Sequence, residues 1–275
     1  AAWLPWAVKY FFLIGVATGA ALLTAACAYG QDGSGARRLL PTAVLVLAMS
    51  AISAPVALLA DLQQPGRFWH FYAHFTPWSW MSIGAVLLPL FFALSVLMAA
   101  LWWLGQRRWM RLLAPVLVLS ALSIVVYTGA EIMVIRARPL WNTLWVPINL
   151  ALTGCLATVG WAFVLYRFLP ARLQPGAAAL QGLRKLGLGL ALALVAVGGL
   201  WAITGLMGGN ASFDAALRLV QQFPVWRMTM IGSAVLGALV LMALLRGRTR
   251  MQAWGFSMVL GVALALATPA LASLP

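Results

Sequence analysis

Residues 79–104, SWMSIGAVLLPLFFALSVLMAALWWL, decide the fold class of this chain. The stretch contains no charged residue, and a helix of roughly 20 apolar residues is long enough to cross a bilayer. It is continuous and rich in Leu, Ala and Val, whereas the strands of a membrane barrel alternate polar and apolar residues. The stretch therefore predicts a transmembrane helix.

Seven further blocks have the same character. Together with 79–104 they predict an all-α polytopic membrane protein, with eight transmembrane helices in a single domain over residues 1–275. The composition agrees, because 64% of the residues are hydrophobic and only 8% are charged, against about a quarter in soluble domains. Cys27 and Cys155 lie in separate blocks and indicate neither a disulfide nor a metal framework. The further blocks fall near 7–29, 38–60, 109–135, 143–167, 184–207, 226–245 and 251–273.

The net charge of +14 comes from basic residues grouped near the ends of these blocks. Counted over alternate connections, twelve Lys and Arg fall on one side and six on the other. The positive-inside rule makes the side with twelve cytoplasmic, which puts both termini outside, in a bacterial inner membrane. This distribution argues against nucleic acid as a partner. The twelve are Arg37, Arg38, Arg107, Arg108, Arg111, Arg167, Arg172, Arg184, Lys185, Arg246, Arg248 and Arg250, and the six are Lys9, Arg67, Arg136, Arg138, Arg218 and Arg227.

Polar residues concentrate in the connection over residues 61–84, which this topology places outside. It holds Asp61, one of four acidic residues in the chain, together with Arg67, His70 and His74. Polar groups are costly in a membrane protein, so such a cluster predicts a functional site. Two simpler interpretations stay open: Asp61 and Arg67 form a salt bridge that caps a turn, and the histidines belong to an ordinary loop.

Three other segments bring polar side chains to the same end of the predicted bundle. Lys9 follows the outer start of the first helix, where it can also simply snorkel to the interface, and Trp80 opens the third helix. Tyr127 and Glu131 lie four residues apart, and therefore on one face of the fourth helix near its outer end. A carboxylate at that depth is expensive, so Glu131 is predicted to handle protons.

The polar residues narrow the chemistry of the site. Two histidines are too few for a cytochrome b with two haems, and at i and i+4 of one connection they do not sandwich a single haem. No cysteine run for an iron–sulfur cluster and no phosphate-binding loop is present. The sequence therefore predicts no haem and no metal in this chain. A tyrosine, carboxylates, histidines and basic residues around a pocket open to lipid suit a quinone.

Two gapped motifs resemble those of the NrfD/PsrC family, the membrane subunits of polysulfide-reductase-type complexes. The first is Asp61-Leu62-x-x-Pro65-x-Arg67-Phe68-Trp69, then Ser79-Trp80-Met81-Ser82-x-Gly84. The second is Tyr127-Thr128-Gly129, then Trp141-Asn142-Thr143 and Pro147. The first helix also fits, with Tyr10, Gly15 and Gly19. The resemblance covers roughly residues 1–160, and the count of eight helices extends it to the whole chain.

The resemblance implies that ubiquinone or menaquinone binds near the outer face of a bundle of the first four helices, residues 1–135, supported by residues 136–275. It implies two partners: an extrinsic subunit with ferredoxin-like [4Fe–4S] clusters and a molybdopterin catalytic subunit. The family's quinone-site tyrosine corresponds to Tyr127, and the Asp of its D-L-x-x-P motif to Asp61. The expected reactive residues are Tyr127, Glu131 and Asp61, and the expected quinone-binding residues are Tyr127, His70, His74, Lys9, Arg67 and Trp80.

The family has polar residues just before the first helix, where this chain has Trp3, Pro5, Trp6 and Lys9. The residue that bonds the second carbonyl of the quinone is therefore not identified by the motifs, and His70 and His74 are candidates. Two other functions are also compatible with the sequence. A secondary transporter would place ionisable residues at the midplane of broken helices, whereas the deep polar groups here lie in one half near one face. A passive membrane anchor would need the outer connection but neither Tyr127 nor Glu131.

Overall fold

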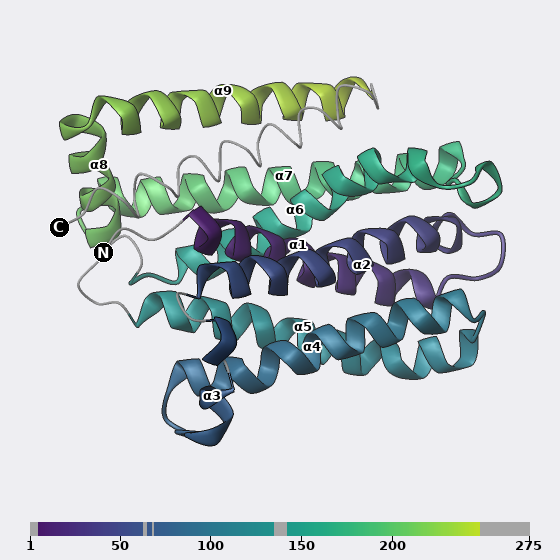
Figure 1. Ribbon diagram of the computed structural model, residues 1–275. Coiled ribbons are helices and arrows are strands. Elements are labelled where there is room, and N and C mark those ends of the chain that lie inside the picture. Colours follow the sequence, from purple (N-terminus) through teal and green to yellow (C-terminus); the bar gives the residue numbers. More distant parts are fainter. Residues whose placement is uncertain (1–4, 63–64, 68, 135–141, 248–275) are drawn as a thin grey trace.

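The long helices of the protein lie side by side in an elongated bundle (Figure 1). The computed structural model describes residues 5–62, 65–67, 69–134 and 142–247, and the regular elements in these ranges are all helices. The long helices are α1 (Pro5–Ala28), α2 (Gly35–Asp61), α4 (Trp80–Trp103), α5 (Arg107–Met133), α6 (Trp145–Leu165), α7 (Ala177–Leu206) and α9 (Pro224–Arg246). Short elements connect them: η1 (Pro65–Arg67), α3 (His70–Ala73), η2 (Tyr166–Phe168), η3 (Ala171–Leu173) and α8 (Ala211–Gln222).

Six of the described helices are long and apolar enough to cross a membrane, and they match the first six predicted blocks. The seventh block, 226–245, is helical as α9, and within it Gly237–Arg246 is an apolar segment shorter than the six spans. The eighth block, 251–273, lies outside the described residues. The protein is therefore a multi-pass membrane protein with six candidate spans in its described part: Lys9–Ala28, Gly35–Ala60, Trp80–Trp103, Arg107–Met133, Trp145–Phe168 and Ala177–Leu206.

Helix α1 lies at the centre of the bundle, packed against α2, α5 and α6. Its small residues make this possible, since Ala17, Ala20 and Ala21 are fully buried. Gly15 and Gly154 bring the backbones of α1 and α6 together, because a Cβ on Gly154 would lie 2.6 Å from the Gly15 carbonyl oxygen. Close approach at small residues is a common way for membrane helices to associate without a hydrophobic driving force.

The alternating directions of the helices separate two ends of the bundle. One end holds the start of α1 together with α3 and α8, and is termed the outer end (Figure 1). The opposite, inner end holds the α1–α2 and α4–α5 connections (Figure 1). Helices α4 and α5 pack against each other, and α7 packs against α6 and α2. The start of α4 and the end of α5 therefore meet the start of α1 at the outer end.

The inner end is held by contacts of the α1–α2 connection with the start of α5. The Asp32 carboxylate accepts hydrogen bonds from Arg107 Nη1 at 2.8 and 3.1 Å, and it lies 3.8 Å from Arg37 Nε. The Tyr29 hydroxyl donates to the Arg111 carbonyl oxygen at 2.8 Å. Both salt bridges among the described side chains belong to Asp32. Exposed charge pairs, which no sequence motif indicated, therefore link the α1–α2 connection to the start of α5 at this end.

Helix α8 was not predicted, and it forms a short element between α7 and α9 at the outer end (Figure 1). The Asn210 side chain caps its start by accepting from the Ser212 backbone N–H at 3.1 Å. Trp201 Nε1 of α7 donates to the Ser212 hydroxyl at 2.9 Å. Ala216 and Leu219 are buried against the bundle. The helix therefore lies on the end of the bundle and does not cross it.

Candidate functional site

The most buried part of the site is built where α5 packs against α4. Tyr127 of α5 is 5% exposed, and its hydroxyl lies directly over Gly84 of α4, where an added Cβ would overlap it. Trp80, one helical turn before Gly84, has its ring centroid 6.4 Å from that of Tyr127, with the planes inclined by 44°. The glycine is required because a side chain at this position would displace the phenol.

The Tyr127 phenol interacts with the Glu131 carboxyl group, which lies one turn further along α5. Glu131 is half-buried and takes part in neither of the two described salt bridges. Tyr10 of α1 is 5% exposed and lies within electrostatic range of both Tyr127 and Glu131. Three helices thus contribute to one group of side chains, termed the phenol–carboxyl cluster: Tyr10, Trp80, Tyr127 and Glu131.

The depth of the cluster follows from the end of α5. That helix ends at Met133, six residues beyond Tyr127, which corresponds to about 9 Å at ~1.5 Å per residue. Trp80 is the first residue of α4 and is 37% exposed. The cluster therefore begins at the outer end of the bundle and reaches inward by nearly two helical turns.

The outer connection carries Arg67, His70 and His74 on η1 and α3, and all three are exposed. His70 packs against Trp69 with ring centroids 4.0 Å apart, and His74 follows at 6.3 Å from His70. The two histidines lie on the surface of the connection, whereas Tyr127 is buried. The structure thus brings the histidines to each other but does not place them within the phenol–carboxyl cluster.

Two hydrogen bonds hold the outer connection against the start of α4. The Tyr72 hydroxyl donates to the Ala85 carbonyl oxygen at 2.9 Å. The Thr76 backbone N–H donates to the Ser82 hydroxyl oxygen at 3.2 Å. Four large side chains of the connection nevertheless stay exposed, namely Trp69, Tyr72, Phe75 and Trp78. The connection is therefore a folded, aromatic surface next to the cluster.

Two further predicted residues lie at the outer ends of α1 and α2. Lys9 is exposed on α1. Asp61 is the last residue of α2, but its side chain is not among those described. The predicted Asp61–Arg67 salt bridge therefore lies outside the described part of the structure. Trp80, by contrast, is brought to Tyr127 as the sequence suggested.

The residues of the second motif support α5 from α6. A Cβ on Gly129 would overlap the Pro147 ring, so this glycine lets α6 approach α5 beside Tyr127. The Asn142 side-chain amide donates to the Met133 carbonyl oxygen at 3.0 Å, which satisfies a free carbonyl at the end of α5. Trp141 lies outside the described residues. These contacts fix the turn of α5 that carries Tyr127 and Glu131.

Metal-binding side chains do not gather in the described ranges: no group of three or more His, Cys, Asp or Glu residues is close enough to hold an ion. Cys27 and Cys155 are thiols on separate helices, the first buried and the second half-buried. In the described part of the chain, the candidate site is therefore defined by the phenol and carboxyl groups of the cluster and not by a group of metal-binding side chains.

The sequence profile of the family described as "Polysulphide reductase, NrfD" matches residues 1–269. The chain belongs to the NrfD family. It is 41% identical to a subunit of tetrathionate reductase from Salmonella typhimurium over 167 residues, which cover 56% of this chain and 46% of that protein. It is 28% identical to Protein NrfD of Escherichia coli over 174 residues, 53% of each chain. The chain thus spans about half the length of these two curated relatives.

The predicted family is confirmed, and the structure gives several NrfD motif residues a physical role. Ser82 anchors the outer connection, Gly84 makes room for Tyr127, and Gly129 makes room for Pro147. Tyr10 was missed as a site residue. Its signals in the sequence are its place among the first-helix residues that fit the family and its position near the start of that helix, at a depth that matches Tyr127 on an antiparallel neighbour.

Proposed function

We propose that this NrfD-family subunit binds a quinone at the phenol–carboxyl cluster and exchanges electrons between the quinone pool and an extrinsic iron–sulfur subunit. The observation that carries the proposal is the buried Tyr127 phenol, which interacts with Glu131 and lies beside the partly exposed ring of Trp80. These groups fit a lipophilic head group with carbonyl oxygens, because they combine a hydrogen-bond donor, a titratable group and an aromatic wall near the outer end.

Each residue of the cluster has a distinct role in this proposal. A bound quinone supplies the redox chemistry, in which two electrons and two protons are taken up or released. The Tyr127 hydroxyl orients the head group through a hydrogen bond to one carbonyl, worth about 0.5–1.5 kcal/mol net. Glu131 holds the proton that is exchanged, since it lies within hydrogen-bonding reach of that phenol. Tyr10, buried on the facing helix α1, donates to the second carbonyl.

Tyr10 is better placed for the second carbonyl than either histidine. His70 and His74 are exposed on the outer connection, whereas Tyr10 is buried and lies within electrostatic range of Tyr127. A hydrogen bond made away from water is not weakened by competition with solvent. We therefore assign His70 and His74, with Arg67, to the surface that faces a partner subunit, and Lys9 to the rim of the site.

The partner subunits belong to the proposal as well. The Salmonella relative is named as one of the subunits of a tetrathionate reductase. The exposed aromatic surface of the outer connection suits docking of a ferredoxin-like [4Fe–4S] subunit, because Trp, Tyr and Arg are frequent anchors of interfaces. A molybdopterin catalytic subunit would then receive or supply the electrons. Such a surface next to the cluster keeps the electron path from the quinone short.

The orientation of the bundle follows from its charges. Ten of the twelve basic residues assigned to the cytoplasmic side lie within the described ranges. Eight of them lie at or near helix ends at the inner end, and Arg184 and Lys185 lie about two turns inside α7 from its inner start. Lys9, Arg67, Arg218 and Arg227 lie toward the outer end. Arg136, Arg138, Arg248 and Arg250 are outside the described residues. By the positive-inside rule the inner end faces the cytoplasm, which places the cluster near the periplasmic face of the bacterial inner membrane.

Binding of a quinone analogue to the purified complex tests the proposal. Tyr127→Phe removes one hydroxyl and little volume, so affinity should fall about two- to tenfold, the equivalent of one hydrogen bond. The matched control is Tyr29→Phe, which removes a phenol hydroxyl at the inner end of the same bundle and should leave affinity unchanged. Equal affinity in the native and Tyr127→Phe complexes, or no binding at all, would overturn the proposal in favour of a transporter or a passive anchor.

A further inference from the structure

The inner end of the bundle carries an excess of positive charge. Asp32 is the one acidic residue of the chain at this end, because Asp61, Glu131 and Asp214 lie toward the outer end on α2, α5 and α8 (Figure 1). Eight basic residues of the described ranges lie at or near helix ends there. The chain therefore cannot balance this charge itself, and an anion from outside would be stabilised at the inner end.

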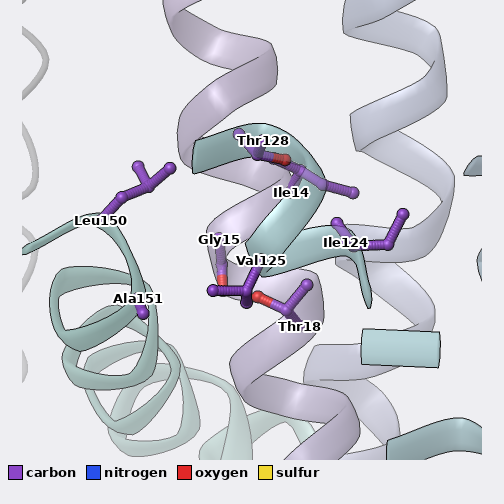
Figure 2. A pocket seen from close by; sticks show the side chains of 8 residues that line it. All are labelled: Ile14, Gly15, Thr18, Ile124, Val125, Thr128, Leu150 and Ala151. Carbon is purple, nitrogen blue, oxygen red and sulfur yellow. The ribbon is translucent and has the colours of Figure 1, made fainter. Parts of the chain in front are cut away.

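The hollow between α1, α5 and α6 offers a different environment. Its eight lining residues carry no charge, and their only polar side chains are those of Thr18 and Thr128 (Figure 2). A charged ligand would lose its hydration there without gaining a counter-charge, which is expensive. A site for an anion is therefore expected among the arginines of the inner end and not in this hollow.

Three arginines, termed the arginine triad, gather around Asp32: Arg37, Arg107 and Arg111. Arg107 Nη1 lies 2.8 Å and Arg37 Nε 3.8 Å from the same carboxylate oxygen, Oδ1. Arg111 follows Arg107 by one turn on the same face of α5 and lies within electrostatic range of Arg37. Three guanidinium groups therefore share one carboxylate, so two positive charges of the triad have no counter-charge from this chain.

The described contacts use one nitrogen of each guanidinium group. Arg107 and Arg37 face Asp32 through Nη1 and Nε. Arg111 Nε donates to the carbonyl oxygen of Ala28, the last residue of α1, at 3.3 Å. A guanidinium presents five N–H donors in a planar fork that matches the oxygens of a phosphate. Arg107 and Arg111 are exposed neighbours on one helix face, with Cβ atoms about 5–6 Å apart, so both reach one phosphate group.

The depth of the triad indicates what kind of phosphate it meets. Two of the candidate spans begin here, Gly35–Ala60 and Arg107–Met133, so the triad lies in their first turns, at the level of the lipid headgroups. From the triad inward, α5 presents exposed apolar side chains at helical spacing, namely Leu112, Val116 and Leu119. A ligand that contacts both regions has a phosphate joined to acyl chains, as a phospholipid has.

We propose that the arginine triad binds the headgroup phosphate of an anionic phospholipid in the leaflet at the inner end. Arg107 and Arg111 donate to the phosphate oxygens, and Arg37 adds a third positive charge beside them. A zwitterionic lipid is bound less well, because its own cationic group would be repelled by the arginines. Basic sites between helices at the cytoplasmic face are known to select anionic lipids. The site does not depend on the quinone proposal, because it lies at the opposite end of the bundle.

The direct test is native mass spectrometry of the full chain in detergent, titrated with phosphatidylglycerol or with phosphatidylcholine of the same acyl chains. The native chain should bind phosphatidylglycerol about tenfold or more tightly. Arg107→Gln with Arg111→Gln should weaken that binding about ten- to thirtyfold and leave phosphatidylcholine binding unchanged. The matched control is Arg218→Gln with Arg227→Gln, which removes two exposed arginines at the outer end and should keep the native affinity.

Three results would overturn the proposal. The native chain could bind the two lipids equally. The control pair could lose as much affinity as the Arg107 and Arg111 pair, which would show attraction by net charge alone. Inorganic phosphate at the concentration of the lipid could displace phosphatidylglycerol, which would make the triad a site for a free anion, whereas we expect no displacement because phosphate has no acyl chains.

Thermal unfolding with a lysine pair separates lost binding from lost folding. Arg107→Lys with Arg111→Lys keeps both charges and the partner of Asp32, so it should retain most of the preference for phosphatidylglycerol. Because a ligand stabilises the state that binds it, phosphatidylglycerol should raise the unfolding midpoint of the native chain and of the lysine pair above the value in phosphatidylcholine. The glutamine pair should show no such difference. A native chain with the same midpoint in both lipids would contradict the proposal.

Discussion

The two ends of the bundle use carboxylates in opposite ways. At the inner end the side chain of Asp32 is 76% exposed and pairs with Arg107 and Arg37. At the outer end Glu131 is half-buried and interacts with the Tyr127 phenol. Exposed ion pairs contribute about 0–1 kcal/mol, whereas a carboxyl inside a membrane boundary is expensive and usually functional. The comparison separates an exposed carboxylate in ion pairs from a half-buried carboxyl, for which we propose a role in proton exchange.

The largest expected effect concerns the exposed surfaces of the two ends. Arg67→Ala with Trp69→Ala should release the iron–sulfur subunit on purification, since each interface anchor of this kind is worth about 2 kcal/mol or more. The matched control is Arg108→Ala with Trp109→Ala at the inner end, where Trp109 is 59% exposed against 54% for Trp69. The amount of iron–sulfur subunit retained is measured by quantitative mass spectrometry. Full retention after the Arg67 and Trp69 changes would place docking elsewhere, for example on 208–225.

A second prediction concerns the packing of Tyr127 over Gly84. Gly84→Ala inserts a methyl that overlaps the phenol hydroxyl, and overpacking costs about 1–3 kcal/mol, so affinity for a quinone analogue should fall about five- to hundredfold. Adding Tyr127→Phe removes the overlapping oxygen but leaves ring carbon Cζ 2.5 Å from the added methyl, so the double variant should recover only part of the affinity lost through Gly84→Ala. Gly182→Ala is the control, because nothing lies within 4 Å of the added carbon there. If the affinity losses of Gly84→Ala and Tyr127→Phe simply add in the double variant, the two residues do not contact each other.

A smaller effect is expected at Tyr10. Tyr10→Phe should weaken quinone-analogue binding about two- to tenfold through loss of one hydrogen bond. His70→Ala and His74→Ala should leave affinity unchanged, because both side chains are exposed on the outer connection. The reverse pattern, with loss in either histidine variant and none in Tyr10→Phe, would move the second carbonyl partner to the outer connection.

The smallest effect is expected at the inner end. Asp32→Asn removes an exposed ion pair and should lower the free energy of unfolding by less than about 1 kcal/mol, with a smaller effect at high salt. Quinol-linked turnover should stay at the native rate, because Asp32 lies at the opposite end of the bundle from Tyr127 (Figure 1). A large loss of turnover in Asp32→Asn with normal complex content would contradict a purely structural role for Asp32.

Much of the fold could be predicted from the sequence, because membrane spans are set by composition alone. The block 79–104 is observed as Trp80–Trp103, and 109–135 as Arg107–Met133. Helix α7 begins at Ala177, earlier than the predicted 184. The prediction took Arg184 and Lys185 as a boundary, but both residues are good helix formers and let the helix continue through them. The short helix α8 carries no long apolar run and was missed.

Part of the candidate site was predicted from the sequence. Tyr127 and Glu131 were paired from their spacing of four residues, and the two side chains interact in the structure. The helix count placed Trp80 at the same end, where its ring lies against Tyr127. The approach of Tyr10 and the fit of Gly84 depend on how α1 and α4 pack against α5, which no local pattern specifies. The pairing of Asp32 with Arg107 was missed for the same reason, since the two residues are 75 positions apart.

The central claim is that Tyr127 and Glu131 bind a quinone and exchange its protons. Quinol-linked electron transfer in membranes, with complex content quantified beside it, tests that claim most directly. Glu131→Gln keeps shape and hydrogen bonding but cannot exchange a proton, so turnover should fall about a hundredfold or more, while quinone-analogue affinity changes little. Tyr127→Phe should slow turnover less, and Tyr29→Phe should match the native rate. Native rates in both Glu131→Gln and Tyr127→Phe would contradict the account.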